Sequence, residues 1–336
     1  MNRIAALLPL LFSVAHAQTE WQVSKTFAVG GSGGWDYLTV DPAAHRLYVP
    51  RGTHTMVIDS ETGKTIADIP GQKVAHGVAI VPTAGRGFIS DGGGTGAIVV
   101  FDLNTNAVLG SIPAQPDSDG IIYDPGSGFV IVVSGDKGTM MMFKPDINPK
   151  KGKIATSIDL GGAPEFLAAD GAGKVYVNLM DKDQVAVVDI ESAKVLSRWP
   201  VAPGGSPVGM DLDTQKHRLY LGCRKPQKLI VMSSEDGKII ADLPIGDRVD
   251  AVKIENGSIF ASAADGALSV ARETSEGKFE IVQTVATPRG ARTMGVDSTL
   301  HRIFLPTAEY RPGPTATAAP VVKPNTFKIV VVEQTK

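Results

Sequence analysis

The sequence predicts an all-β fold, a seven-bladed β-propeller. Its repeat is clearest in Tyr37-Leu-Thr-Val-Asp-Pro-Ala-Ala-His-Arg-Leu-Tyr-Val49 and in Met210-Asp-Leu-Asp-Thr-Gln-Lys-His-Arg-Leu-Tyr-Leu221. When the copies are aligned on their first strand, one column contains Asp36, His76, Asp119, Glu165, Val208, Asp250 and Arg292. Successive members of this column are 40, 43, 46, 43, 42 and 42 residues apart. A period near 40 residues is typical of a four-stranded propeller blade.

Each copy is expected to contain two short alternating strands around a tight turn, then a third strand and a hairpin into a fourth. The segment 185–196 illustrates the second half of a copy, and helical periodicity is almost absent after residue 20. Glycine and proline fall between the apolar runs, as in Pro203-Gly-Gly-Ser-Pro207, where they suit turns. We therefore expect residues 18–336 to form a single propeller domain.

The ends of the chain predict how the ring closes. The last copy stops after its third strand, Phe327-Lys-Ile-Val-Val-Val-Glu333, so blade seven lacks a strand. The segment Trp21–Val29 precedes the first full copy and resembles the fourth strands of other blades, such as Lys238–Leu243. Pairing it with residues 327–333 would complete blade seven and remove an open sheet edge.

The N-terminus has the features of a Sec-type signal peptide. Arg3 precedes the apolar run Ile4–Val14, and Ala15-His16-Ala17 supplies the small residues of a cleavage site. This pattern predicts cleavage after Ala17 and a periplasmic or secreted protein. The apolar run is too short to span a bilayer, and no similar run of sufficient length follows, so we expect no membrane span.

Charge and cysteine content restrict the function further. The formal net charge is −2, or −3 without the signal peptide and its Arg3, and acidic and basic residues are interspersed. No basic patch predicts nucleic-acid binding. Cys223 is the only cysteine, so an intrachain disulfide is excluded, and we expect a buried structural thiol. A monomer is the expected state.

The segment Gly173-Lys-Val-Tyr-Val-Asn-Leu-Met-Asp-Lys-Asp-Gln-Val-Ala-Val-Val-Asp-Ile-Glu-Ser-Ala-Lys-Val-Leu196 resembles the YVTN-type β-propeller repeat. This is the pattern of YncE-like and surface-layer-like exported proteins, and the resemblance extends over nearly all of residues 20–336. It implies a seven-bladed propeller used for binding or as a scaffold outside the cytoplasm. It implies no catalytic residues, because the repeat motif is structural.

The aligned column is the candidate site, because first strands of propeller blades start beside the central channel. Two interpretations remain open. In one, neighbours form ion pairs around a wet channel, since Arg292 lies between Asp250 and Asp36 and His76 between Asp36 and Asp119. In the other, Asp119 and Glu165 hold a hard divalent cation such as Ca²⁺, with His76 or Asp36 completing the site.

Histidines and loops supply the remaining candidates. His45, His217 and His301 precede similar Arg-Leu-Tyr or Arg-Ile-Phe segments and are expected in turns on the opposite face. His54 is expected in a channel-face loop, together with the polar rim residues Asp91, Asp136, Lys137, Asn178, Asp181, Lys182, Arg224, Lys225 and Asp265. Such a rim could orient a small anionic or sugar-like ligand.

A long proline-rich loop at 306–326 is expected to be extended with little internal pairing. It supplies Tyr310 and Arg311, residue types that anchor ligands when a loop covers a channel mouth. The alternative is a disordered loop that takes no part in binding. The predicted ligand-binding residues are therefore Asp36, His54, His76, Asp119, Glu165, Asp250, Arg292, Tyr310 and Arg311.

Two functions follow from these observations. The first is a propeller that binds a small ligand or another envelope protein through the channel face, and it requires no cofactor. The second is a metal-dependent hydrolase or lyase of the lactonase kind, with a divalent cation at Asp119, Glu165 and His76. Signatures of serine hydrolases, of zinc proteases with His-Glu-x-x-His and of covalent haem are missing from the sequence, so no catalytic residue is assigned.

Overall fold

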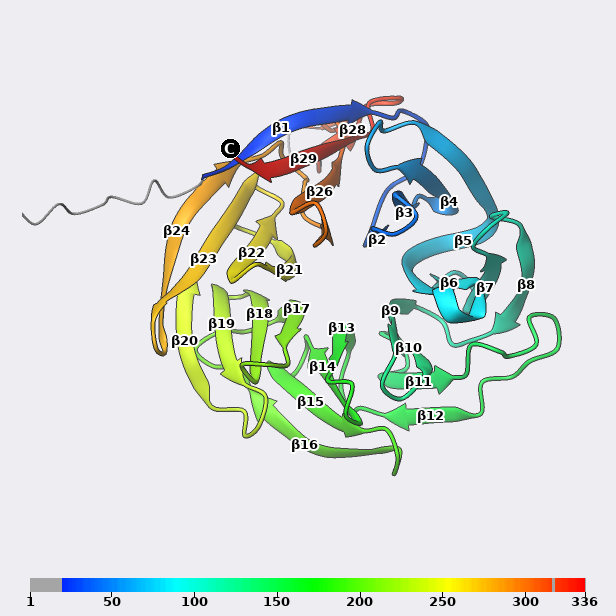
Figure 1. Ribbon diagram of the computed structural model, residues 1–336, viewed down its shortest axis with the longest axis horizontal. Coiled ribbons are helices and arrows are strands. Elements are labelled where there is room, and N and C mark those ends of the chain that lie inside the picture. The colour runs from blue at the N-terminus through cyan, green and yellow to red at the C-terminus, as the bar shows by residue number, and fades with distance from the viewer. Residues whose placement is uncertain (1–19, 316–317, 336) are drawn as a thin grey trace, which may run out of the picture.

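A computed structural model describes residues 20–315 and 318–335, and these form a ring of antiparallel sheets around a central axis (Figure 1). Six sheets make up the blades, because blades one and two share the long strand β5 and form one seven-stranded sheet. The other five blades are separate four-stranded sheets. The predicted all-β, seven-bladed propeller is confirmed. The predicted signal peptide, residues 1–17, lies outside the described residues.

The strands of blades one to three are β2 (Thr39–Asp41), β3 (Arg46–Pro50), β4 (Gly52–Asp59), β5 (Thr65–Val81), β6 (Arg86–Asp91), β7 (Ala97–Asp102), β8 (Val108–Pro113), β9 (Ser118–Asp124), β10 (Phe129–Ser134), β11 (Thr139–Phe143) and β12 (Thr156–Asp159). A short 3₁₀ helix, η1 (Pro82–Ala84), follows β5.

The strands of blades four to six are β13 (Pro164–Ala169), β14 (Lys174–Leu179), β15 (Gln184–Asp189), β16 (Lys194–Pro200), β17 (Pro207–Asp213), β18 (Arg218–Arg224), β19 (Gln227–Ser233), β20 (Ile239–Pro244), β21 (Val249–Glu255), β22 (Ser258–Ala263), β23 (Ala267–Ser275) and β24 (Lys278–Ala286). Blade seven contains β25 (Gly295–Asp297), β26 (Arg302–Thr307), β29 (Lys328–Gln334) and the N-terminal strand β1 (Trp21–Ala28).

The ring closes through antiparallel pairing of β1 with β29, which places the first and last strands side by side (Figure 1). The register runs from Trp21 opposite Gln334 to Ala28 opposite Lys328. Trp21 is buried and packs edge-on against Phe260 of blade six, with ring centroids 4.8 Å apart. The predicted closure is confirmed, and it covers the edge that β29 would otherwise expose.

The hydrophobic core lies between neighbouring blades. Where blades one and seven meet, for example, Leu47 and Ile58 pack with Phe304 and Val331 in one buried cluster. Alternate residues of each strand face opposite sides, so each sheet contributes apolar side chains to two such clusters. This packing holds the first strand of each blade in place around the axis.

The turns between first and second strands lie on one face of the ring. His45, His217 and His301 occupy these turns with φ near 53°, 54° and 52°. Residues other than glycine seldom adopt this left-handed backbone conformation. The three histidines therefore occupy equivalent positions in the turns of the repeat. Cys223 is fully buried in β18, as expected, and burial raises its pKa to about 12.

The proline-rich loop is more ordered than the sequence suggested. It contains a small hairpin of β27 (Tyr310–Arg311) and β28 (Val321–Val322). The backbone N–H of Lys323 donates to the Glu309 carbonyl at 2.8 Å, and the two side chains form an ion pair at 3.0 Å. The expectation of little internal pairing is therefore wrong, because this cross-strand pair extends the ladder. Among the described residues, no helix is long and apolar enough to cross a membrane.

Candidate functional site

The channel mouth is built from irregularities in the first strands. The pairing of β21 with β22 skips Asp250, since Val249 pairs with Ala263 and Ala251 with Ser262. Similar register shifts fall at His76, Asp119, Glu165 and Val208. A bulge frees a residue from the ladder and redirects its side chain. The backbone itself thus sets the column apart from the regular sheet.

Three members of the column meet at the mouth. His76 Nδ1 lies 2.8 Å from Asp36 Oδ2 and 3.5 Å from Asp119 Oδ1. All three side chains are about four-fifths buried, at 19%, 19% and 17% exposure. The Asp119 Oδ1 atom is buried and accepts no hydrogen bond from the described residues. A buried oxygen that accepts no hydrogen bond destabilises the folded protein unless an ion, a water molecule or a ligand pairs with it.

The charges of this group act on one another. Burial alone would lower the pKa of His76, but the hydrogen bond to Asp36 and the charges of Asp119 and Asp36 raise it to about 9. Burial and the charge of Asp36 raise the pKa of Asp119 well above its usual range. The arrangement therefore favours a positive charge placed between the two carboxylates.

A second group forms around Asp250, which is 6% exposed. Arg292 Nε lies 2.8 Å from Asp250 Oδ2, and the Arg224 guanidinium contacts the other carboxylate oxygen. Arg224 ends the second strand of blade five, and its contact with Asp250 confirms that these two parts of neighbouring blades converge. The sequence placed Arg224 only among scattered rim residues, because side-chain direction across a blade boundary is not visible in the repeat.

The Glu165 side chain forms no ion pair or hydrogen bond with the described residues. Burial raises its pKa to about 7, against the lowering effect of Arg224 and with the help of Asp250 and Asp36. Val208, the apolar member of the column, is fully buried. Ion pairs therefore satisfy only part of the column, and Glu165 is the carboxyl group in it without an ion pair among the described residues.

A pocket of about 290 Å³ adjoins this mouth beneath the β27–β28 hairpin. We call it the arginine pocket, because Arg248, Arg289 and Arg292 line it. Trp35, Tyr310 and Gly290 also line it, and Ala319, Pro320 and Val322 come from the hairpin segment. None of the described lining residues carries a carboxylate, so the pocket is electropositive.

The charges of the three arginines act on Tyr310, an aromatic residue that lines the arginine pocket. Burial raises the pKa of Tyr310, and Arg292, Arg289 and Arg248 each oppose that rise. The ring of Tyr310 lies 6.4 Å from that of Trp35 in an edge-on arrangement. No acceptor among the described residues bonds the Arg289 guanidinium, whereas Arg292 is paired with Asp250. Arg248 is exposed and lies 3.5 Å from Asp247.

The other predicted site residues lie elsewhere. His54 belongs to β4 and not to a loop, because Gly52 adopts φ 75° and lets that strand begin immediately after Arg51. Its Nε2 lies 3.6 Å from Asp68, away from the Asp36–His76–Asp119 group. Arg311 is exposed on β27 and does not line the arginine pocket. Tyr310 does line it.

Among the described residues, Asp36, His76 and Asp119 form the group that could hold a metal ion, with ligand atoms within 4.8 Å of one another. The set named from sequence was Asp119, Glu165 and His76, so Asp36 takes the place of Glu165. Two carboxylates and one imidazole are ligands that divalent cations accept. The imidazole must be neutral on the ligating nitrogen, so a bound cation would displace its proton.

Comparison with known proteins defines the class by its fold. One solved structure, of hydrazine synthase from Kuenenia stuttgartiensis, superposes with a TM-score of 0.69 over 82% of this chain and 92% of that one. The two sequences are 12% identical, so the similarity extends to the β-propeller fold alone. No model of a known protein family matches the sequence, and no curated protein matches it either.

Proposed function

We propose that this protein is a ligand-binding β-propeller that recognises a small anion at its channel face. The observation that carries the proposal is the arginine pocket, where three guanidinium groups and the Tyr310 side chain converge on about 290 Å³ without a lining carboxylate. A pocket of this size suits a compact organic acid or phosphate. Concave sites with a few convergent polar groups are where proteins bind small molecules.

Arginine is well matched to such a ligand. Its planar guanidinium donates paired hydrogen bonds to carboxylate or phosphate and stays charged at all physiological pH values. Arg289 is the group most available, because the described residues offer it no acceptor. Arg292 is held in place by Asp250 at 2.8 Å, which fixes its direction at the pocket wall.

The hairpin provides the cover. Tyr310 approaches the backbone of Gly290 so closely that a Cβ at that position would lie 2.3 Å from the phenol oxygen. Pro320 and Val322 complete the apolar part of the lining. An anion enclosed in this way would be partly removed from water, which strengthens its bonds to arginine.

A screen by thermal unfolding tests the proposal, because a ligand that binds only the native state must raise the midpoint. The probes are inorganic phosphate, sulfate, succinate and benzoate, each titrated at constant ionic strength. We expect at least one saturable rise that Arg289→Met removes. Arg311→Met is the matched control, since it deletes a neighbouring arginine that lies outside the lining. No saturable rise with any probe, or an equal loss in both variants, would contradict the proposal.

The cellular setting belongs to the same proposal. The YVTN-type repeat and the signal-like segment 1–17 support a member of the exported, YncE-like group that works in the periplasm or outside the cell. N-terminal sequencing of protein recovered from a bacterial envelope fraction checks this. Cleavage after Ala17 is expected, and an intact N-terminus would contradict export.

A second candidate function is a metal-dependent hydrolase or lyase, favoured by Asp119 Oδ1 of the Asp36–His76–Asp119 group, which is buried and accepts no hydrogen bond from the described residues. A cation there would polarise a carbonyl, and Glu165, with a pKa of about 7, could carry a proton. Thermal unfolding with Ca²⁺, Mn²⁺ and Zn²⁺ after chelation, beside turnover of a lactone panel, tests it.

This candidate requires a metal-dependent midpoint shift and turnover that Asp119→Asn abolishes and Asp136→Asn keeps. Asp136 is an exposed carboxylate on a loop of the same face and serves as the control. An unfolding midpoint that none of the three ions changes would contradict this candidate and would leave the Asp36–His76–Asp119 group as a cluster of ion pairs.

A further inference from the structure

The central channel contains a second chamber on the other side of the polar column. This cavity has a volume of about 1130 Å³ and begins one or two residues beyond the column, at Tyr37, Gly77, Phe166 and Gly209. Its lining extends to Pro42, Pro82, Pro125 and Thr299, in the turns of the face opposite the mouth. We call it the apolar chamber.

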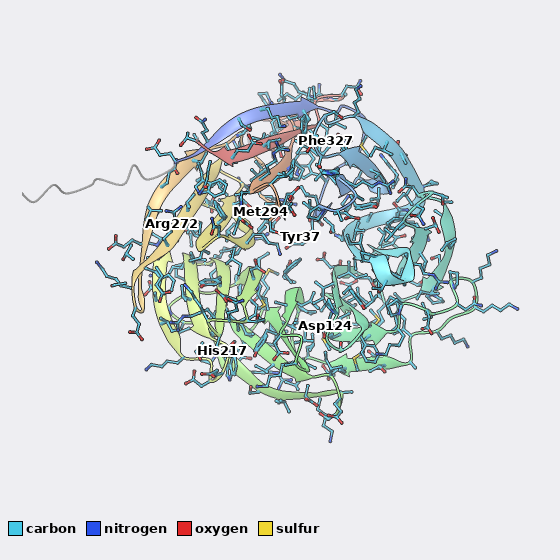
Figure 2. The ribbon with its side chains drawn as sticks, in the orientation of Figure 1. Tyr37, Asp124, His217, Arg272, Met294 and Phe327 are labelled. Atoms are coloured by element: carbon cyan, nitrogen blue, oxygen red, sulfur yellow. The ribbon has the colours of Figure 1, made fainter. Side chains whose placement is uncertain are left out.

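All seven blades contribute apolar side chains to this chamber, among them Val40, Ile80, Ile122, Phe166, Met210 and Val296. Val40, Ile80, Ile122 and Val296 are only half-buried, although they belong to the innermost strands of the ring. Apolar side chains that remain exposed around a concave space favour an apolar occupant over water. Figure 2 shows Tyr37 and Met294 beside the central opening of the ring.

Two aromatic rings line the end of the chamber that adjoins the polar column. Tyr37 of blade one packs against Phe166 of blade four, with centroids 4.7 Å apart and planes inclined by 41°. The Tyr37 hydroxyl donates to the Asp250 carbonyl of blade six at 3.2 Å. This contact joins three blades across the axis, so the polar mouth and the apolar chamber are distinct environments.

Among its described residues the chamber wall carries one lysine, Lys253, and no arginine. Its other ionisable side chains, Asp41 and His45, come from the turn region of blade one, where Asp41 Oδ1 accepts from the Ala44 N–H at 3.1 Å and His45 Nδ1 lies 3.8 Å from Glu61. Lys253 Nζ lies 5.2 Å from the centre of the Phe166 ring and 3.8 Å from Asp211 Oδ1. No described group accepts a hydrogen bond from this ammonium, and an ammonium has three donors. A lysine ammonium at an apolar wall is complementary to a ligand with one negative charge at the end of an apolar body.

We infer that the apolar chamber binds an aliphatic monocarboxylic acid, with the chain along the channel and the carboxylate at Lys253. A monoanion fits better than a phosphate dianion, because Asp211 lies close to the Lys253 ammonium and no arginine or second lysine is among the described lining residues. This binding is independent of anion recognition in the arginine pocket, since the two sites open on opposite faces of the ring.

The test uses a fluorescent aliphatic acid, 11-(dansylamino)undecanoic acid, and its methyl ester. The mature protein is expected to bind the acid saturably with one site, and to bind the ester at least tenfold more weakly. Lys253→Met should reduce binding of the acid to the level of the ester and leave the ester unchanged. Equal affinity for acid and ester, or no saturable binding, would overturn the proposal.

Two variants locate the site. Val296→Trp and Ile122→Trp place a large side chain in the chamber from blades seven and three, and either one that keeps the wild-type circular dichroism spectrum should abolish binding of both probes. Leu196→Trp, at a position 56% exposed on β16, is the matched control and should bind normally. Arg289→Met should also bind the acid normally. Unchanged binding in a folded chamber variant, or loss in Arg289→Met, would overturn the assignment.

Discussion

Tyr37 and Phe166 meet across the central channel, although Tyr37 lies just before the first strand of blade one and Phe166 lies on the first strand of blade four, 129 positions further along the chain. Both rings line the apolar chamber, and each directly follows a residue of the polar column, Asp36 or Glu165. This change in polarity matters because charged and apolar ligands need opposite surroundings. One ring can therefore present two different sites on its two faces.

Ring closure predicts a large effect of Trp21, which is 2% exposed and packs on Phe260. Trp21→Ala should lower the free energy of unfolding by about 3–5 kcal/mol, through lost burial and the cavity left behind. Val23→Ala is the control, because this residue of the same strand is 39% exposed and should change stability by less than about 0.5 kcal/mol. Chemical denaturation measures both, and equal effects would contradict the closure.

The raised pKa of Glu165 predicts how stability depends on pH. Its pKa is about 7 in the folded protein and near the ordinary 4.5 when unfolded. The neutral carboxyl is favoured on folding, so its contribution is fully present below pH 4.5 and is lost as pH rises through 7. Glu165→Gln should match the wild type at pH 4 and exceed it by about 1–2 kcal/mol at pH 8, after allowance for partial exposure.

Arg224 provides the check on this prediction, because its charge lowers the pKa of Glu165. Arg224→Met should move the loss of stability to higher pH. This shift should be smaller when the change is made in Glu165→Gln, where only Asp250, the other carboxyl group whose pKa Arg224 lowers, still responds. The midpoint of thermal unfolding is measured from pH 4 to pH 9. A difference between wild type and Glu165→Gln that stays constant over this range would contradict the assignment.

The contact between Gly290 and Tyr310 predicts that the hairpin is needed for binding. Gly290 has φ 84°, and a Cβ there would collide with the phenol oxygen. Gly290→Ala should displace Tyr310 and weaken anion binding at least tenfold, besides costing stability. Gly277→Ala is the control: its φ is 71° and no heavy atom would lie within 4 Å of a new Cβ. Gly277→Ala should lose about 1–2 kcal/mol of stability through backbone strain and should bind the anion normally.

The sequence predicted the architecture well, because a repeat of one strand pattern is visible without any knowledge of contacts. Closure by residues 21–29 followed from a missing strand, and Asp36, His76, Asp119, Asp250 and Arg292 do gather at the mouth. Neighbouring column positions come from neighbouring blades, so the order along the chain gives the order around the ring.

The arginine pocket could not be predicted in the same way. Arg248 and Arg289 lie in irregular segments just ahead of the column, and they line one pocket together with Tyr310 and Val322 of the β27–β28 hairpin. A basic residue two or three positions before the column in blades six and seven was the available signal. The Tyr37–Phe166 contact depends on side-chain length and direction across the axis, which repeat spacing does not contain.

The central claim, anion recognition by the arginine pocket, is tested most directly by isothermal titration calorimetry of the mature protein. The titrant is the probe that raises the unfolding midpoint most, and the proteins are wild type, Arg289→Met and Arg311→Met. We expect one site, with binding at least tenfold weaker in Arg289→Met and unchanged in Arg311→Met, because a charge-assisted hydrogen bond contributes roughly 1.5–3 kcal/mol. Equal affinity in all three proteins would contradict the account.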